Sequence, residues 1–214
     1  MASRRHLTTV TEAAAEALTL SEVKMYAKVD GNVEDSLLEA YITSARIAMQ
    51  EHLRRSIINQ SLMLTLDQDY SCAQDQLGEG VYQLPPSVLG GGLASVIELP
   101  KPPLVSVTSV KTYDLDNTET TVSSTYYTVD TAGGRVFLNS GYIWPSSLRQ
   151  LAAMKITYVA GYGTANTSVP RPIRQGMLMH IKLMYDSRLE CDMPAECKSL
   201  VSSFRIMDRL ALNG

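Results

Sequence analysis

Oxygen-bearing side chains at alternate positions near residue 30 suggest a calcium-binding loop. Asp30, Asn32 and Glu34 match the first, third and fifth positions of such a loop. The sixth position of a calcium loop is a glycine and the twelfth is a bidentate carboxylate, but here these are Asp35 and Tyr41. We therefore interpret this stretch as a helix start and expect no calcium site.

Residues that could form a nucleophilic or zinc centre are few and scattered. No histidine stands beside a serine or cysteine motif of the kind that activates a nucleophile. The three cysteines are too widely spaced for a disulfide framework or paired zinc knuckles. These residues are His6, His52, His180, Cys72, Cys191 and Cys197. We expect no enzymatic activity, no cofactor, and no catalytic, cofactor-binding or metal-binding residues.

Composition favours a folded protein that does not hold nucleic acid. Of the 214 residues, 45% are hydrophobic and 19% are charged, which is enough apolar surface for a buried core. The net charge of -3 provides no positive field for binding DNA through counterion release. No stretch approaches the roughly 20 apolar residues of a bilayer span, so we expect no membrane segment.

Hydrophobic spacing predicts three helices. Thr19 and Glu22 form a capping-box pattern, which predicts a helix over residues 20–28. Apolar residues at steps of three and four predict a long helix over residues 33–55, and the same spacing after Pro170 predicts a last helix over 172–188. We expect these helices to pack together.

Between the helices the period changes to two, which predicts strands. Leu62, Leu64 and Leu66 alternate with less apolar residues, and turn clusters separate the strands that follow. We expect strands at residues 96–99, 105–113, 126–129, 135–138 and 154–159, arranged as an antiparallel, meander-like sheet. The fold class is therefore α+β, with a β-rich insert over 60–160 between the helices of one domain over 19–188.

Three segments are predicted to lie outside this core. Residues 1–18 show no clean apolar face and are expected to form an arm or a frayed helix. Residues 72–95 are rich in glycine and proline, and residues 189–214 form an apolar tail. We expect the last two segments to contact neighbouring proteins, through Val81, Tyr82, Leu84, Leu200, Val201, Phe204, Met207 and Leu210. The alternatives are that residues 72–95 form a β-hairpin folded on their own domain and that the tail packs on its own chain.

The order of several short segments resembles the head-tail connector (adaptor, or head completion) family of long-tailed bacteriophages. The resemblance covers residues 18–204, and each segment by itself is a weak signal. The segments are Leu20-Ser21-Glu22-Val23-Lys24, Val29-Asp30-Gly31, Gln60-Ser61-Leu62, Leu99-Pro100-Lys101-Pro102-Pro103-Leu104, Tyr142-Ile143-Trp144-Pro145, Val159-Ala160-Gly161-Tyr162-Gly163 and Val169-Pro170.

The resemblance implies a structural subunit of the virion neck. Such a subunit would be made in the host cytoplasm and would assemble, in about twelve copies, into a ring beneath the portal protein. Tail-completion or tail-terminator proteins would dock on the ring, and DNA would pass through its lumen without specific binding.

A second interpretation comes from the aromatic residues of the predicted sheet. These rings could line a groove of a small-ligand or carbohydrate-binding module. The residues are Tyr113, Tyr126, Tyr127, Tyr142 and Trp144.

Overall fold

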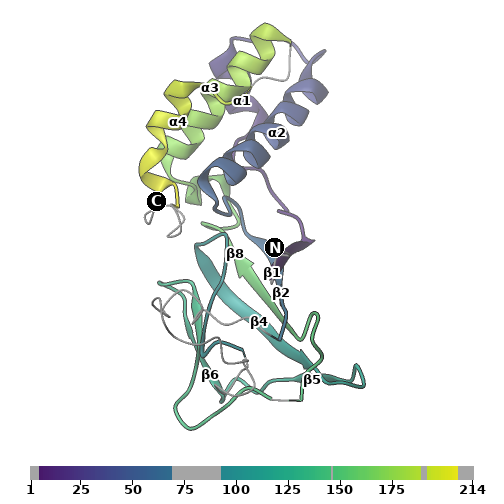
Figure 1. Ribbon diagram of the computed structural model, residues 1–214. Helices are drawn as coiled ribbons and strands as arrows, with labels where there is room; N and C mark the ends of the chain where they lie inside the picture. Colours follow the sequence, from purple (N-terminus) through teal and green to yellow (C-terminus); the bar gives the residue numbers. More distant parts are fainter. Residues whose placement is uncertain (1–4, 69–92, 146, 189–191, 207–214) are drawn as a thin grey trace, which may run out of the picture. The chain divides into compact units, whose positions relative to one another are not determined.

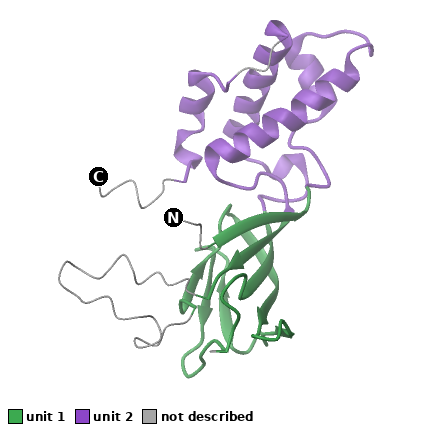
Figure 2. Cartoon of the chain, turned by 45° about the vertical axis from the view of Figure 1, so that its right-hand side comes forward, with its two compact units in different colours: residues 1–12, 61–160 green, residues 13–60, 161–214 purple. Residues whose placement is uncertain are grey.

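The helices of the chain collect in one unit and its strands in another (Figure 2). The computed structural model describes residues 5–68, 93–145, 147–188 and 192–206. Residues 1–12 and 61–160 make the sheet unit, and residues 13–60 and 161–214 make the helical unit. This mixture of helices and antiparallel strands confirms the predicted α+β class.

The helical unit begins with two helices whose starts follow from local sequence. Helix α1, Leu20–Ala27, carries the predicted capping box: the Thr19 side chain accepts from the Glu22 amide, and Glu22 accepts from the Thr19 amide. Helix α2, Asp35–Leu53, starts after Glu34. Val33, which we expected inside this helix, precedes it and is exposed.

Helix α3, Arg171–Ser187, starts just after Pro170 and contributes a face to the same core as α1 and α2. A single-turn 3-10 helix, Asn166–Ser168, precedes it. Buried side chains recur at helical spacing on both long helices, which is how two amphipathic helices bury their apolar faces. They include Leu38, Ile42, Met49 and Leu53 of α2, and Ile173, Met177, Ile181 and Met184 of α3. No helix in the described part of the chain has the length and apolar character to cross a membrane.

Ion pairs connect the helices of this unit at their polar margins. Arg174 of α3 pairs with Glu22 of α1, and Lys24 of α1 pairs with Asp35 of α2 at 2.6 Å. Because these groups remain partly exposed, each pair contributes little stability by itself. Their arrangement nevertheless favours one register between the helices.

The predicted tail is partly a component of the helical unit. Helix α4, Ala195–Leu200, and the 3-10 turn Ser202–Phe204 pack through Cys197 and Val201 into the core formed by α2 and α3. The Ile206 amide donates to the Leu53 carbonyl at 3.1 Å. Residues 192–206 are therefore not a free arm, because their apolar residues have a partner surface in their own chain.

The sheet unit contains two sheets in place of the expected meander (Figure 1). The five-stranded sheet has the order β1-β2-β8-β4-β5, and the three-stranded sheet has the order β3-β7-β6. Their bounds are β1 Arg5–Thr11, β2 Gln60–Leu66, β3 Val96–Glu98, β4 Leu104–Tyr113, β5 Glu119–Thr121, β6 Tyr127–Asp130, β7 Arg135–Leu138 and β8 Met154–Ala160. A meander was the wrong topology, because β8 lies between β2 and β4, far from both in sequence.

Strand directions follow from backbone hydrogen bonds. The β1–β2, β4–β8 and β4–β5 pairs are antiparallel. Just before β2, the Asn59 amide donates to the Gly163 carbonyl at 3.0 Å, and the Tyr162 amide donates to the Ile57 carbonyl at 3.2 Å. Because β2 thus begins where β8 ends, these two strands also run in opposite directions.

Strand β1 corrects the expectation that residues 1–18 lie outside the fold. Residues 5–11 pair with β2, for example Leu7 opposite Leu64 and Thr9 opposite Leu62. The pairing gives this Thr-rich segment backbone partners although its side chains are mostly exposed. It is a strand, and neither a frayed helix nor a separate arm.

Buried residues of both sheets form a single hydrophobic cluster, so the two sheets pack against each other. The alternation predicted for β2 is present: Leu62, Leu64 and Leu66 are buried, whereas Ser61, Met63 and Thr65 are not fully covered. Tyr158 of β8 is buried with its hydroxyl donating to the Pro100 carbonyl at 2.7 Å. A buried hydroxyl needs such a partner.

Candidate functional site

The three histidines considered for catalysis lie on three different elements, β1, α2 and α3. His6 is exposed on β1, whereas His180 is buried on α3. The pKa of His52 is lowered, chiefly by burial and further by the nearby charges of Arg205 and Lys198. Among the described residues, no group of three or more His, Cys, Asp or Glu could hold a metal ion.

The cysteines and the calcium-like loop are accounted for where they are described. Cys197 is a buried free thiol, and burial raises its pKa. Asp35 of the calcium-like loop is engaged by Lys24, which also donates to Asn32 at 3.0 Å. This loop therefore supports the start of α2. Cys72 and Cys191 lie outside the described residues.

The predicted interface residues fall into three groups. Leu200 is 41% exposed and available to a partner. Phe204 is partly buried against the helical core, and Val201 is fully buried there, with 0% exposure. Val201 is therefore a core residue of the subunit in this structure. The remaining five lie outside the described residues: Val81, Tyr82, Leu84, Met207 and Leu210.

The sheet unit carries a groove of about 380 Å³ beside strand β5. It is lined by Thr112 of β4, residues 120–123, Tyr126 and the segment Ile143-Trp144-Pro145. Ile143 is 84% exposed, and several other large apolar side chains on the surface of this protein are exposed as well. Its lining combines hydroxyl-bearing side chains, such as Thr120 and Thr121, with apolar ones, such as Val122 and Ile143.

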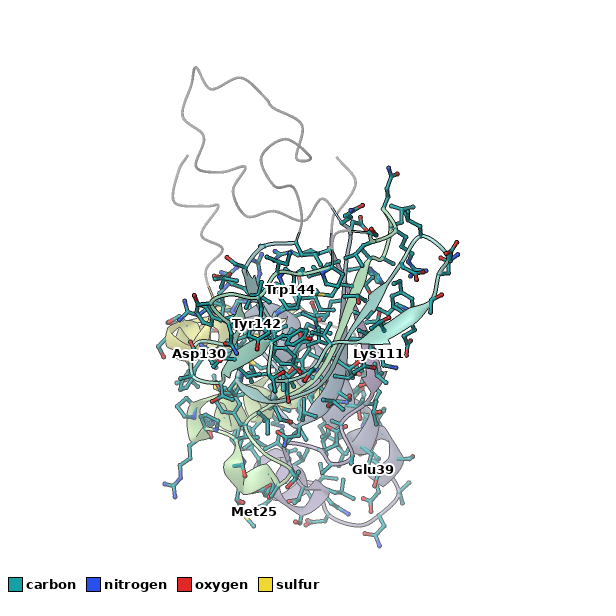
Figure 3. The ribbon with its side chains drawn as sticks, turned by 90° about the horizontal axis from the view of Figure 1, so that it is seen from below. Met25, Glu39, Lys111, Asp130, Tyr142 and Trp144 are labelled. Atoms are coloured by element: carbon teal, nitrogen blue, oxygen red, sulfur yellow. The ribbon has the colours of Figure 1, made fainter. Side chains whose placement is uncertain are left out.

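The aromatic residues around this groove do not form an open stacking platform. Trp144 lines the groove but is only 7% exposed, and its indole nitrogen donates to the Ala94 carbonyl at 2.9 Å. Tyr142 stacks on Tyr126, with ring centroids 4.5 Å apart (Figure 3 labels Tyr142 and Trp144). These rings are largely occupied with one another and with the protein, which weakens the carbohydrate-binding alternative.

The other two aromatic residues of that alternative do not line the groove. Tyr113, at the end of β4, has the guanidinium carbon of Arg149 at 4.3 Å and the Lys155 ammonium at 4.8 Å from its ring centroid. Tyr127 is partly buried against the sheet core. Of the five predicted aromatic residues, only Tyr126 is both exposed and part of the groove.

A charged cluster marks the outer end of the β4–β5 pair. Lys111, labelled in Figure 3, donates to Glu119 at 2.6 Å, and the Tyr113 hydroxyl donates to the same carboxylate at 2.6 Å. These two donors, Lys111 first, lower the pKa of Glu119. Asp114 accepts from the amides of Asp116 and Thr118, which closes the turn between the strands.

Sequence reasoning identified the aromatic residues but not the groove itself. Thr120 and Ile143 are 23 positions apart, and neither carries a recognisable motif. The run Tyr142-Ile143-Trp144 in a turn-rich segment is the signal that could have pointed to part of the groove lining, because Ile143 and Trp144 both line it.

Solved structures with a similar fold come from phage-like particles. The chain matches a protein in "Neck of empty GTA particle computed with C6 symmetry" with a TM-score of 0.68 and 19% identity, over 94% of this chain and 96% of that chain. A chain of "Virion of native gene transfer agent (GTA) particle" matches with a TM-score of 0.69 and 20% identity, over 94% and 95%. A third match, from "Neck of native GTA particle computed with C12 symmetry", has a TM-score of 0.67 and 19% identity, over 94% and 96%.

Comparison of the sequence with known proteins identifies a family. No curated protein sequence matches the chain. The model of one family, described as phage gp6-like head-tail connector protein, matches residues 17–131, which is more than half of the 214 residues. The two-unit fold and this match agree with the segments that suggested a connector, and the chain belongs to the phage gp6-like head-tail connector family.

Proposed function

We propose that this chain is a structural subunit of a ring that sits beneath the portal and joins the DNA-filled head of a tailed phage or phage-like particle to its tail. The observation that carries the proposal is the match of 94% of the chain to a protein of a particle neck, together with its membership of the connector family. Neck structures computed with six- and twelve-fold symmetry support a ring as the assembled state.

Within such a ring, the work of the subunit is assembly through buried surface. Exposed apolar side chains occur on both units, for instance Met25 and Leu200 on the helical unit and Ile143 on the sheet unit. Protein partners would cover such residues: further copies of the chain, the portal, and tail-completion or tail-terminator proteins. DNA would pass through the lumen without being bound, in keeping with the net charge of -3.

Electron microscopy and native mass spectrometry of the purified protein, alone and mixed with its portal, test this proposal. We expect rings of the free protein or caps of this protein on the portal. A protein that stays monomeric in both samples and leaves the portal bare would contradict it. Calorimetric titration of the same protein preparation with oligosaccharides tests the carbohydrate-binding alternative.

A further inference from the structure

The five-stranded sheet has two exposed edges among the described residues, β1 and β5. All three residues of β5 are exposed, and in β1 only Leu7 is partly covered. An edge strand presents backbone N–H and C=O groups that the sheet itself does not use, and proteins normally cover or block such edges. Both edges of this sheet are therefore surfaces on which another strand can pair.

The β5 edge is the better-formed of the two acceptors. The Val122 amide donates to the Val110 carbonyl at 2.8 Å, and Thr120 lies opposite Thr112. Because successive residues of a strand alternate in direction, the amide of Thr121 points away from β4, toward the free edge. The groove lined by Tyr126 and Ile143 runs beside the same residues. Backbone groups next to an apolar groove are the requirements for recognition by strand addition.

The charges of the two edges are complementary. Residues 1–11 contain no acidic residue and carry the basic Arg4, Arg5 and His6. Residues 112–134, which include β5, contain no Lys or Arg and carry Asp114, Asp116, Glu119 and Asp130. Lys111 and Arg135 pair with the last two, whereas no ion pair among the described residues involves Asp114 or Asp116. The start of β1 is thus basic, and the turn before β5 carries the carboxylates of Asp114 and Asp116, although Arg149 also reaches this turn and donates to Asn117 at 3.1 Å.

Strand direction supports the same pairing independently. Each neighbouring pair in the order β1-β2-β8-β4-β5 is antiparallel, so β1 and β5 run in the same direction. Adjacent subunits of a twelve-membered ring differ by a rotation of about 30°, which reverses no strand. A neighbour's β1 placed beside β5 would therefore run parallel to it. Parallel pairing is also the direction that brings the basic start of β1 to the acidic turn before β5.

We propose that β1 of one subunit pairs in parallel with β5 of the next copy, with Val10 entering the groove beside Tyr126 and Ile143. Val10 is 54% exposed in the single subunit, although it is an aliphatic residue in a folded strand. Because each subunit offers one edge and receives the other, the contact is head-to-tail, which is the kind of contact that builds a ring when the rotation between neighbours closes. This inference rests on the ring function proposed above.

Proline at position 121 tests the backbone contact. Thr121→Pro removes an edge amide without removing a β4–β5 hydrogen bond, whereas the control Thr121→Val keeps the amide. We expect the first variant to lower the fraction of ring, with or without portal, by about tenfold, and the control to leave it unchanged. Circular dichroism and thermal unfolding verify that each subunit is folded.

Cysteine cross-linking tests register and direction in a folded background with Cys72 and Cys191 replaced by serine. We expect Thr8→Cys combined with Thr121→Cys, or His6→Cys combined with Thr121→Cys, to give a ladder of covalent oligomers on oxidation. Thr11→Cys combined with Glu119→Cys should not, because parallel pairing keeps these positions roughly 20 Å apart.

The outcomes separate this inference from the function on which it rests. Rings formed equally by Thr121→Pro and Thr121→Val, with no ladder from either cross-linking pair, would overturn the inference alone. A ladder from the Thr11 and Glu119 pair would show antiparallel pairing and overturn it too. Absence of rings and portal caps for the unmodified chain would overturn the proposed function, and this inference with it.

Discussion

Gly161 lies against the backbone of Asn59 so closely that a Cβ atom at position 161 would come within 2.5 Å of the Asn59 nitrogen. Gly161 directly follows β8 and has a φ of +150°, a conformation that side chains disfavour. The hydrogen bonds between the segments before β2 and after β8 form at this point. Glycine is thus required here by both space and conformation.

Gly161→Ala should destabilise the subunit strongly. A clash with backbone atoms cannot be relieved by a rotamer change, so we expect a loss of about 3 kcal/mol or more in the free energy of unfolding. Gly31→Ala is the control, because Gly31 also has a positive φ, +84°, but a Cβ atom added there would have no neighbour within 4 Å. It should cost only about 1 kcal/mol. Equal losses in urea denaturation would contradict the steric argument.

Val201 and Leu200 should respond differently to truncation. Val201→Ala removes buried methyl groups and should lower the unfolding free energy of the isolated subunit by about 2 kcal/mol. Leu200→Ala removes largely exposed surface and should change it by no more than about 0.5 kcal/mol. If Leu200 is an interface residue, its substitution should instead weaken assembly in the ring or portal mixture. If the Val201→Ala subunit is as stable as the unmodified one, Val201 does not stabilise the core, and its predicted role as an interface residue stands.

Glu16 supports a buried guanidinium. The Arg46 side chain is 5% exposed, its Nε donates to Glu16 at 2.8 Å, and its Nη1 has no hydrogen-bond partner among the described residues. Glu16→Ala should leave this cation without its counter-charge and cost about 2 kcal/mol, somewhat less than a fully buried pair because Glu16 is partly exposed. Asp186→Ala, which breaks the exposed pair with Lys182, should cost at most about 0.5 kcal/mol. Thermal unfolding of both variants measures the two losses of stability, and equal losses would contradict the role of Glu16.

Glu34 should make stability depend on acidic pH. The Tyr185 hydroxyl donates to its carboxylate, and Arg188 donates to it at 2.6 Å, and these two contacts hold the pKa of Glu34 below its ordinary value of 4.5. A lowered pKa in the folded state means that the stabilisation is present above pH 4.5 and is lost as pH falls through the lowered pKa.

Denaturation of Glu34→Gln at several pH values measures this contribution. The unmodified chain should be more stable than the variant at neutral pH, and the difference should vanish in strongly acidic solution. Glu39→Gln is a suitable control, since Glu39 is an exposed residue of helix α2, which begins directly after Glu34. A stability difference that persists unchanged at low pH would exclude the carboxylate as its source.

Duplex DNA should bind this protein negligibly near physiological salt. If the proposed ring conducts DNA, it must release the DNA that passes through it, and a chain with a net charge of -3 gives little attraction to phosphate. Fluorescence anisotropy with a labelled duplex measures the affinity. Submicromolar binding that weakens steeply with added salt would contradict passage without binding.

The helices and strands that could be predicted from the sequence are those with one buried face, because a buried face produces a periodic spacing of apolar residues. The step of three and four in α2 and the alternation in β2 arise because each element has one buried face. Strands β1 and β5 show no such spacing of apolar residues because their side chains are mostly exposed. They form only through backbone pairing with β2 and β4. Short propensity signals do not reveal such pairing.

The strand order and the groove could not be predicted from the sequence for a related reason. Strand β8 pairs between β2 and β4, which are both separated from it by dozens of residues. No local sequence pattern predicts which distant strands pair with each other. Val201 was assigned to an interface because the weakly periodic apolar residues around it do not show whether its own chain or another chain covers them. The groove required Thr120 and Ile143 to be brought together by the fold.

The chain changes unit after residues 12, 60 and 160, and this connectivity orders events during synthesis. Strand β1 emerges from the ribosome first but must wait for β2, and the five-stranded sheet is joined only when β8 appears between β2 and β4. Helix α2 then still lacks α3 and α4, which are made later. The sheet unit cannot finish before residue 160 has been made, and the helical unit cannot finish before α4, so each unit closes only when a late segment of the chain joins an early one.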